Sequence, residues 1–226
     1  MKEGRLILVP TPIGNLRDIT LRAIDILTSC DLVLAEDTRH TRSLLSHLEL
    51  TKNIESLHQN NEHQRVEQLA LRIQNDGLVV AYCTDAGTPG ISDPGYLLVR
   101  ACLDHQIFVE CLPGATAFVP ALVVSGLPSD RFVFEGFLPH KKGRKTRMER
   151  IASEQRTSIL YESTHRILKL LDEIELICGS DREISVSREL TKLHETHYRG
   201  SVSEVKEQLK NDVTKGEFVV LIKGTE

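Results

Sequence analysis

A twelve-residue segment, residues 84–95, combines polar side chains with a tightly restricted backbone. It reads Thr-Asp-Ala-Gly-Thr-Pro-Gly-Ile-Ser-Asp-Pro-Gly, so three glycines and two prolines shape one rigid loop. The apolar residues 78–83 before it predict a buried parallel strand, and residues 96–104 after it predict a helix. Open α/β sheets bind ligands at such a loop, which follows the carboxyl end of a strand. The alternative is an ordinary surface loop rich in glycine and proline.

Two further loops, residues 10–15 and 113–117, also follow expected strands. All three loops offer backbone N–H and C=O groups and few charged side chains. If their strands are neighbours, the loops converge on one crevice, which suits a flat, partly apolar ligand with a few hydrogen-bonding edges. A triphosphate is not expected, because it needs a lysine and a metal ion, and no Gly-Lys-Ser/Thr sequence follows a glycine loop.

Two acidic residues, Glu36 and Asp37, end the second expected strand about 20 residues after the first loop, where a dinucleotide-binding fold holds a ribose. Because the G-x-G-x-x-G pattern is missing, we do not expect a nicotinamide dinucleotide. The pair is then either a polar cluster at the carboxyl edge of the sheet or a helix cap with a local ion pair to Arg39.

The composition is typical of a globular protein with reduced cysteines. Of 226 residues, 40% are hydrophobic and 27% charged, and the formal net charge is −4, so contact with nucleic acid needs a local basic patch. The five cysteines show no C-x-x-C spacing, which favours free thiols and disfavours a structural metal site. The first residues lack an apolar signal segment, and no apolar run approaches the ~20 residues of a membrane span. We therefore expect a cytoplasmic protein with no metal and no membrane contact.

Strand and helix patterns alternate through residues 5–112, which predicts a parallel or mixed sheet with helices on its faces. The expected strands are residues 5–10, 31–35, 53–57, 78–83 and 107–112. The expected helices are one that ends at residue 29 and is capped by Asp18 or Thr20, and residues 41–48, 62–75 and 96–104.

A second α/β unit is predicted after a turn-rich break at residues 127–130. Its expected strands are residues 132–137, 158–161, 183–188, 194–198 and 218–223, the fourth pairing with the third. Its expected helices are residues 144–153, 165–177 and 201–210, and Ser201 and Glu204 have the spacing of a capping box. The boundary lies between residues 113 and 130, so the domains are residues 1–115 and 116–226.

Seven segments, in the right order along the chain, resemble one family. They are residues 8–20, 35–39, 84–95, 113–117, 134–139, 161–166 and 188–192. The first contains Pro-Thr-Pro-Ile-Gly-Asn, the second Glu-Asp-Thr-Arg and the sixth Glu-Ser-Thr-His-Arg. The chain resembles the ribosomal RNA small subunit methyltransferase I family, within the tetrapyrrole methylase superfamily, from residue 5 to about residue 223.

This resemblance implies a homodimer of two-domain α/β subunits with the tetrapyrrole-methylase fold. It implies a Rossmann-like mixed sheet in residues 1–115, which carry the cofactor and substrate loops, and a second α/β domain in residues 116–226, which closes a cleft for S-adenosylmethionine. The implied reaction is methyl transfer to the ribose 2′-oxygen of a cytidine in 16S rRNA near the decoding centre, with the 30S subunit as substrate. The competing hypotheses are a small-molecule methylase of the tetrapyrrole type and a non-catalytic, S-adenosylmethionine-binding ribosome-assembly factor.

The resemblance also implies cofactor contacts, by position, in the loops of both domains: Ile13, Gly14, Asp85, Thr88, Ile91, Thr116, Ala117, Tyr161, Leu190 and Gly216. The candidates for catalysis are five charged residues: Arg39, Glu162, Arg166, Glu189 and Lys192. Holding the oxygen in line with the methyl can contribute ~7–11 kcal/mol, and a general base ~10²–10⁴-fold in rate, so we expect positioning to dominate. Lys192 is a base only if burial lowers its pKa, and otherwise is an exposed lysine. Glu189 could equally form a structural ion pair with Arg188.

A basic run at residues 140–147 predicts salt-sensitive contact with rRNA phosphates through Lys141, Lys142, Arg144, Lys145 and Arg147. The alternative is a solvated helix face. Two features depart from the family. Thr164 stands where relatives often have proline, and many members continue for several dozen residues beyond the last strand, so RNA contacts from such an extension are not expected of these 226 residues.

Overall fold

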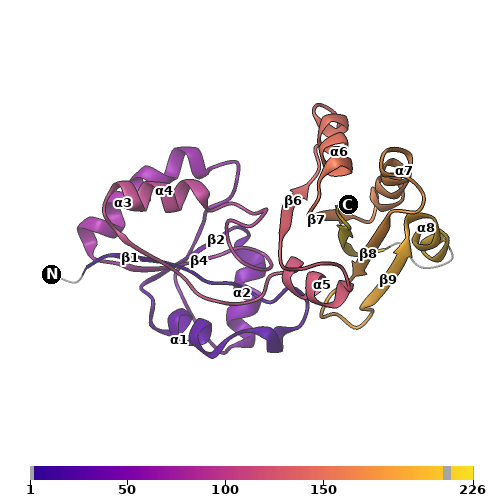
Figure 1. Cartoon of the computed structure of the whole chain (residues 1–226). Coiled ribbons are helices and arrows are strands. Elements are labelled where there is room, and N and C mark those ends of the chain that lie inside the picture. The colour runs from indigo at the N-terminus through magenta and orange to yellow at the C-terminus, as the bar shows by residue number, and fades with distance from the viewer. Residues whose placement is uncertain (1–2, 211–214, 226) are drawn as a thin grey trace. The chain divides into compact units, whose positions relative to one another are not determined.

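The computed structural model describes residues 3–210 and 215–225 (Figure 1). The chain divides into two compact units, Met1–Thr116, which we call unit 1, and Ala117–Glu226, which we call unit 2. Within the described residues, each unit is built on its own five-stranded sheet.

The sheet of unit 1 is parallel throughout. Its strands lie in the order β3-β2-β4-β1-β5. They are β1 (Arg5–Leu8), β2 (Leu32–Ala35), β3 (Ile54–Ser56), β4 (Val79–Cys83) and β5 (Phe108–Cys111). Because a helical crossover separates successive strands, every pairing between them is parallel. Of the parallel or mixed sheet that the alternation of strands and helices predicts, unit 1 has the parallel one, and the Rossmann-like fold is confirmed.

The crossovers of unit 1 are short helices whose ends the local sequence sets. They are the 3₁₀ turn η1 (Leu16–Asp18), α1 (Leu21–Ser29), α2 (Thr38–His47), α3 (Glu62–Asp76) and α4 (Tyr96–Asp104). The side chain of Thr20 accepts a hydrogen bond from the backbone N–H of Ala23 and caps α1, which confirms one of the two expected caps. The side chain of Asp37 caps α2 in the same way, so α2 begins three residues earlier than the expected residue 41.

Two hydrophobic cores cover the two faces of this sheet, since successive residues of a strand point in opposite directions. Leu8 of β1 and Tyr82 of β4 belong to the core with α3 and α4. Ile7 and Ala81 belong to the core with Leu27 of α1. The helices that follow β1 and β4 therefore cover opposite faces. The carboxyl ends of these two neighbouring strands form the switch point at which open α/β sheets bind ligands.

The sheet of unit 2 is mixed, in the order β6-β7-β10-β8-β9. Its strands are β6 (Phe132–Phe137), β7 (Thr157–Ser163), β8 (Glu183–Arg188), β9 (Thr196–Ser201) and β10 (Glu217–Ile222). Strands β6 and β7 are parallel and the other pairs antiparallel, including the expected pairing of β8 with β9. The helices are α5 (Phe118–Ser125), α6 (Arg144–Ser153), α7 (Ile167–Cys178) and α8 (Val202–Lys210).

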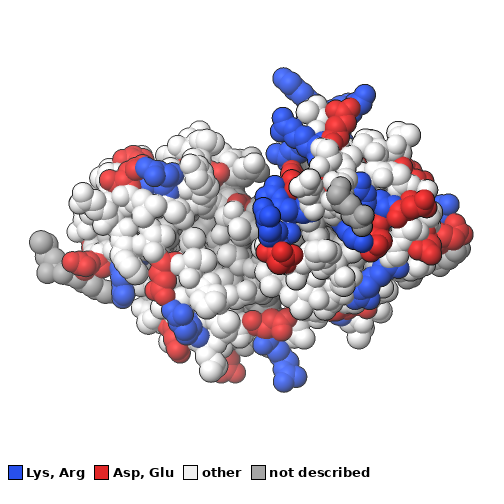
Figure 2. Space-filling model, viewed as in Figure 1, with Lys and Arg blue, Asp and Glu red and all other residues white. Residues whose placement is uncertain are grey.

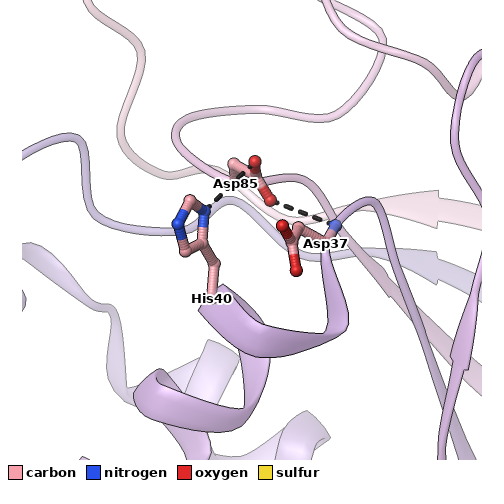
Figure 3. A group of neighbouring side chains, drawn as sticks. All are labelled: Asp37, His40 and Asp85. Atoms are coloured by element: carbon pink, nitrogen blue, oxygen red, sulfur yellow. Dashed lines mark hydrogen bonds and ion pairs between the residues drawn. The ribbon is translucent and has the colours of Figure 1, made fainter.

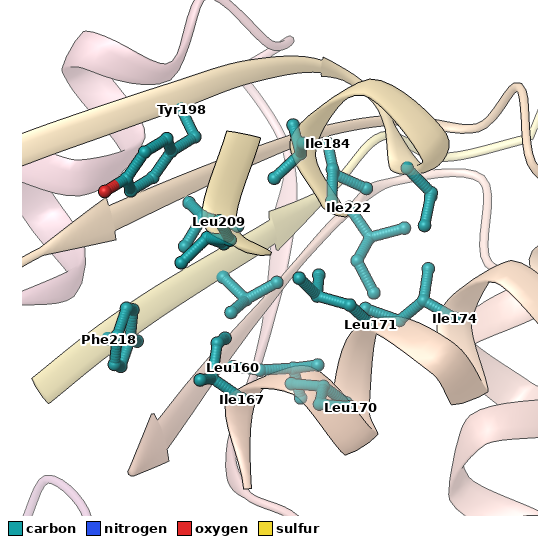
Figure 4. Close-up of a cluster of buried hydrophobic side chains, with 14 of the residues drawn as sticks. Leu160, Ile167, Leu170, Leu171, Ile174, Ile184, Tyr198, Leu209, Phe218 and Ile222 are labelled. Atoms are coloured by element: carbon teal, nitrogen blue, oxygen red, sulfur yellow. The ribbon is translucent and has the colours of Figure 1, made fainter. Parts of the chain in front are cut away.

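The core of unit 2 lies between this sheet and its helices (Figure 4). Leu160, Ile184 and Phe218, from three neighbouring strands, share it with Leu171 of α7 and Leu209 of α8. Each such side chain contributes about 1.5–3 kcal/mol when it is fully buried. The expected capping box of α8 is confirmed, because Ser201 Oγ accepts from the N–H of Glu204 at 3.3 Å and the N–H of Ser201 donates to Glu204 Oε2 at 2.8 Å.

Helix α5 is absent from the sequence prediction, because its apolar sequence shows no helical periodicity. Two local signals could have identified it. Pro120 stands in the first turn, where the missing N–H costs no hydrogen bond, and Gly126 ends the helix in the left-handed conformation at φ +79°. Among the described residues, no helix is long and apolar enough to cross a bilayer.

Candidate functional site

Three loops meet at the carboxyl edge of the sheet of unit 1. Thr11 and Gly87 exchange two backbone hydrogen bonds, each 2.9 Å from N to O, and the hydroxyl of Thr11 donates to the carbonyl of Thr84 at 3.1 Å. The hydroxyl of Thr88 donates to the carbonyl of Ala115 at 2.9 Å and lies 2.7 Å from the hydroxyl of Thr116. The loops after β1, β4 and β5 thus converge, as expected if their strands are neighbours, since β1 lies between β4 and β5.

Two glycines allow the loops to approach this closely. Gly87 has φ +87°, a conformation that L side chains rarely adopt, and a Cβ there would lie 3.5 Å from Cγ2 of Ile13. A Cβ on Gly114 would lie 2.6 Å from Cβ of Pro10, which is closer than such atoms pack. The sequence therefore needs glycine at residue 114 for the first and third loops to meet.

Carboxylates gather at this edge. The N–H of Asp85 donates to Glu36 Oε2 at 3.3 Å, and the N–H of Asp37 donates to Asp85 Oδ1 at 3.1 Å. Burial raises the pKa of Glu36, and the neighbouring charges of Asp85 and Asp37 add to this effect. Burial and the charge of Glu36 raise the pKa of Asp93 to about 7. The loop edge therefore gathers carboxyl groups that would favour a bound cationic group.

His40 joins this group from the first turn of α2 (Figure 3). Its Nδ1 lies 3.1 Å from Asp85 Oδ2. The donor atoms of Asp37, His40 and Asp85 lie within 4.8 Å of one another, close enough for a shared cation. The carboxylate of Asp37 is occupied by Arg39, whose Nε lies 3.0 Å away, and that of Asp85 by His40 and the Asp37 N–H. Asp85 thus links the three residues, and Arg39 from outside the group neutralises Asp37.

Arg39, one of the five expected catalytic residues, is exposed and neutralises the helix cap. Its side chain and backbone N–H both bond to the carboxylate of Asp37, and these hydrogen bonds lower the pKa of Asp37. This is the helix cap with a local ion pair that the sequence left open as an alternative.

Glu162 and Arg166 belong to a buried charge network in unit 2. The carboxylate of Glu162 has no exposed surface and accepts from Arg166 Nε at 2.7 Å and from the N–H of Ser163 at 2.8 Å. Arg144 Nη2 lies 3.8 Å from Glu162 and 2.6 Å from Glu173. The two arginines also donate to the carbonyls of Leu138 and Pro139, at the end of β6. The network thus holds the backbone from which the basic run begins.

Lys192 lies between two carboxylates. Its Nζ lies 2.8 Å from Glu189 Oε1 and 2.9 Å from Glu217 Oε2. Partial burial acts to lower the pKa of Lys192, but the hydrogen bonds to Glu189 and Glu217 outweigh it and raise the pKa. The condition for a lysine base is therefore not met in the structure. Lys192 is a fixed ammonium ion at neutral pH, and Glu189 pairs with it rather than with Arg188.

Gly216 lies against this pair because it lacks a side chain. A Cβ there would lie 2.6 Å from Cγ of Glu189, and the residue has φ +125°. The hydroxyl of Thr164 accepts from the N–H of Gly216 at 2.7 Å and lies 2.6 Å from its carbonyl. Thr164 therefore holds Gly216 in place through its side-chain hydroxyl.

The expected cofactor contacts of unit 2 lie on separate elements. The hydroxyl of Tyr161, on β7, accepts from the N–H of Phe118 at 3.2 Å, next to Ala117, the residue before α5. The rings of Phe134 and Phe137 meet that of Tyr161 edge-on at 5.1 and 5.5 Å. Leu190 follows β8 and is buried.

The basic run lies on α6 and the turn before it, and Figure 2 shows Lys and Arg gathered there. Lys141, Lys142 and Lys145 are exposed, and Arg147 is half exposed beside Glu135, 3.8 Å away. Arg144 differs from these four, because it is buried and bound to Glu173. Arg144 is buried between exposed neighbours because it lies on the inner face of α6. The prediction that Arg144 contacts phosphates is therefore wrong, and it is left out of the phosphate-contacting set.

His40 and Asp93 are two residues of this edge that the sequence does not predict as part of a site. The pattern of α2 could have pointed to His40, which is three residues after the cap Asp37 and therefore on the same side of the first turn. Asp93 could have been noted as a carboxylate inside the rigid loop, but its burial depends on neighbours that only folding brings together.

The fold and the loop edge define the chain as a tetrapyrrole methylase. The family described as Tetrapyrrole (Corrin/Porphyrin) Methylases matches residues 5–206. Among solved structures, diphthine synthase has a TM-score of 0.75 at 13% identity, covering 97% of this chain and 90% of that one. Cobalt precorrin-4 methyltransferase of cobalamin biosynthesis has a TM-score of 0.68 at 17% identity, covering 97% and 94%. At these identities the likeness concerns the fold.

Closer relatives define the family within this class. Ribosomal RNA small subunit methyltransferase I of Escherichia coli O157:H7 is 48% identical over 225 residues, which cover 98% of this chain and 78% of the relative. The protein of the same name from Thermotoga maritima is 43% identical over 223 residues, which cover 99% of this chain and 100% of the relative. The chain belongs to the ribosomal RNA small subunit methyltransferase I family.

Proposed function

We propose that this protein transfers a methyl group from S-adenosylmethionine to the ribose 2′-oxygen of a cytidine in 16S rRNA, near the decoding centre of the 30S subunit. Membership of a methyltransferase family supports the reaction class, and the names of the relatives support an rRNA substrate. The observation that carries the proposal is the acidic edge of unit 1, where three loops meet at a switch point.

The residues of this edge fit the cofactor. S-adenosylmethionine carries a sulfonium ion and an ammonium ion, and a cation bound beside Glu36, Asp85 and Asp93 would favour the ionised form of these crowded carboxyl groups. The loops expose backbone groups for the flat adenine ring. The residues proposed to hold the cofactor in unit 1 are Ile13, Gly14, Asp85, Thr88, Ile91 and Thr116, and those in unit 2 are Ala117, Tyr161, Leu190 and Gly216.

The bound cofactor supplies an electrophilic methyl group on a neutral leaving group, so the chemistry asks the protein mainly for alignment and for a proton acceptor. The loop bonds of Thr11 and Thr88 hold the edge rigid. Lys192, fixed between two carboxylates, positions its loop as a charged group. Glu162 and Arg166 position the backbone of residues 138 and 139. Arg39 keeps the cap of α2 neutral.

Lys141, Lys142, Lys145 and Arg147 are proposed to contact rRNA phosphates. Each such contact releases counterions, so replacing one of these residues by alanine should reduce the slope of log K against log salt by about 0.7–0.9. Lys210→Ala on α8 serves as the matched control, because it is an exposed lysine outside the run. A slope that is the same in all variants would remove the run from the interface.

We also propose a homodimer in the cytoplasm. Exposed apolar side chains support the dimer: Val119 and Val123 on α5 are 48% and 74% exposed, and Phe132 on β6 is 39% exposed. Size-exclusion chromatography with light scattering measures the molar mass of the protein in solution, and a dimer is expected. A monomer at all concentrations would contradict it.

The function is tested by transfer of labelled methyl from S-adenosylmethionine to 30S subunits that lack the modification. Naked 16S rRNA and a tetrapyrrole are run in parallel, and nuclease mapping locates the label. Label on a cytidine 2′-oxygen in 30S subunits is the expected result. Label on the tetrapyrrole alone would make the protein a small-molecule methylase. Cofactor binding without any transfer would make it a binding factor.

A further inference from the structure

We propose that His40, oriented by Asp85, is the general base that accepts the proton of the ribose 2′-hydroxyl. This inference rests on the proposed function and names a residue for it that sequence reasoning did not select. The five residues considered from sequence leave the role open: Lys192 is held protonated, Arg39 and Arg166 are guanidinium cations, and Glu162 and Glu189 are each paired with a cation.

The geometry is that of a carboxylate–imidazole pair. Asp85 Oδ2 lies 3.1 Å from Nδ1 of His40 (Figure 3). A carboxylate can only accept a hydrogen bond, so the neutral ring carries its proton on Nδ1 and presents a lone pair on Nε2. The side chain of His40 is 64% exposed, and within residues 3–210 and 215–225 no hydrogen bond to its Nε2 is found. The acceptor atom is therefore free to meet a substrate hydroxyl.

Asp85 is itself held in place from two sides. Its Oδ1 accepts from the N–H of Asp37 at 3.1 Å, and its own N–H donates to Glu36 at 3.3 Å. Both bonds tie the loop after β4 to the end of β2. The carboxylate therefore faces the first turn of α2 in a defined orientation, which a base needs for its partner.

The charged groups around His40 leave Asp85 as its partner. On its own helix, Asp37 is neutralised by Arg39. On the loop after β4, the groups are Asp85 and Asp93, and at the end of β2 the group is Glu36. Of these carboxylates, that of Asp85 contacts the ring.

The step balances within the two reactants and the ring. The 2′-oxygen forms a bond to the methyl carbon as the carbon–sulfur bond breaks, and the electron pair of that bond stays on sulfur. The hydroxyl proton moves to Nε2 of His40 and afterwards leaves to solvent. A base of this kind contributes roughly 10²–10⁴-fold in rate.

The kinetic test is single-turnover methyl transfer to 30S subunits from about pH 5 to about pH 8, the range in which imidazoles titrate. For the wild type, we expect the rate to rise with pH and then level off. His40→Gln should lower the plateau by roughly 10²–10⁴-fold and remove the break, while the affinity for S-adenosylmethionine, measured by calorimetry, is unchanged. His47→Gln, at the other end of α2, is the matched control and should behave as the wild type.

A second variant tests whether Asp93, rather than His40, causes the break. Asp93 has a pKa of about 7, so Asp93→Asn must keep the break if His40 causes it. Added imidazole should restore part of the rate of His40→Ala, since the free base can replace the missing ring.

A readout without turnover tests the orientation. Nitrogen-15 NMR is recorded on protein labelled at its histidines, and the signal that is missing from the His40→Gln spectrum is assigned to His40. This signal should show that the neutral ring is protonated on Nδ1. Asp85→Asn should change this protonation pattern, because an amide can also donate to the ring.

The outcomes are distinct. A wild-type enzyme that methylates no RNA would overturn the proposed function, and the inference with it. A wild-type enzyme that is active while His40→Gln keeps its rate within about threefold, or keeps the break, would overturn the inference alone. A ring protonated on Nε2 in the wild type would also overturn it.

Discussion

Removing the buried carboxylate of Glu162 should destabilise unit 2 far more than removing an exposed one. The side chain of Glu162 has no exposed surface, whereas Arg144 and Arg166 are 7% and 17% exposed. In Glu162→Ala, the two guanidinium groups share the single remaining carboxylate of Glu173, which lies beside Arg144. One buried positive charge is then uncompensated.

Breaking a buried ion pair by removing one partner costs about 3–5 kcal/mol. Glu162→Gln should cost less, about 1.5–3 kcal/mol, because its amide oxygen can still accept the hydrogen bonds from Arg166 and the N–H of Ser163. The matched control is Glu149→Ala on α6. Its carboxylate is 54% exposed and 3.8 Å from Lys145, so its loss should cost about 0.3–0.5 kcal/mol.

The assay is urea unfolding followed by circular dichroism, since the chain has no tryptophan. With a slope of about 1–3 kcal/mol per molar urea, a cost of about 3 kcal/mol moves the midpoint by about 1–3 M. Hydrogen exchange of β7 and α7 peptides should show the loss of protection in unit 2. A cost below about 1 kcal/mol for Glu162→Ala, or one equal to that of Glu149→Ala, would refute the argument that this network stabilises the fold.

Three further predictions concern the loop edge and Lys192. Gly114→Ala should lower the free energy of unfolding by about 1–3 kcal/mol and weaken the binding of S-adenosylmethionine, because its Cβ would lie 2.6 Å from that of Pro10. Urea unfolding measures the first effect and calorimetry the second. Unchanged binding would show that the contact between Gly114 and Pro10 does not shape the cofactor site. The pKa of Asp93 is raised from 3.8 to about 7, so the folded protein binds this proton more tightly than the unfolded chain does. The free energy of unfolding of the wild type should therefore fall relative to that of Asp93→Asn as the pH rises from about 4 to about 7. The same pH dependence of stability in both proteins would contradict this prediction. Lys192→Arg should keep its methyl-transfer rate within about tenfold of the wild type, with an unchanged pH profile, because arginine can still pair with Glu189 and Glu217. An inactive variant would instead support the hypothesis that Lys192 is the general base.

Local patterns in the sequence predicted most of the elements of this fold. Helices α4 and α6 and strands β6 and β8 have the expected ends, and the caps Thr20 and Ser201 act as predicted. The reason is that apolar periodicity and capping depend on residues a few positions apart. Helix α5 was not predicted because its sequence is apolar on all sides, and the hydrophobic pattern alone does not distinguish such a helix from a buried strand.

In the candidate site, too, some features could be predicted from local sequence and others could not. The sequence indicated the three loops at strand ends, since glycine and proline restrict the backbone wherever they stand. It also placed Arg144 in an exposed basic run, because charge alone does not show which residue of a helix faces the core. In the structure Glu173, a helix away, takes up that guanidinium group.

The family, the alternation of strands and helices, and the rigid loops of residues 10–15, 84–95 and 113–117 follow from residue types and short spacings, so they can be predicted from the sequence. Which charges meet depends instead on the folded chain. Folding brought His40 of α2 to Asp85 after β4 and kept Lys192 protonated between Glu189 and Glu217. Such pairs depend on which strands become neighbours, and electrostatic energy falls with distance in space rather than along the chain.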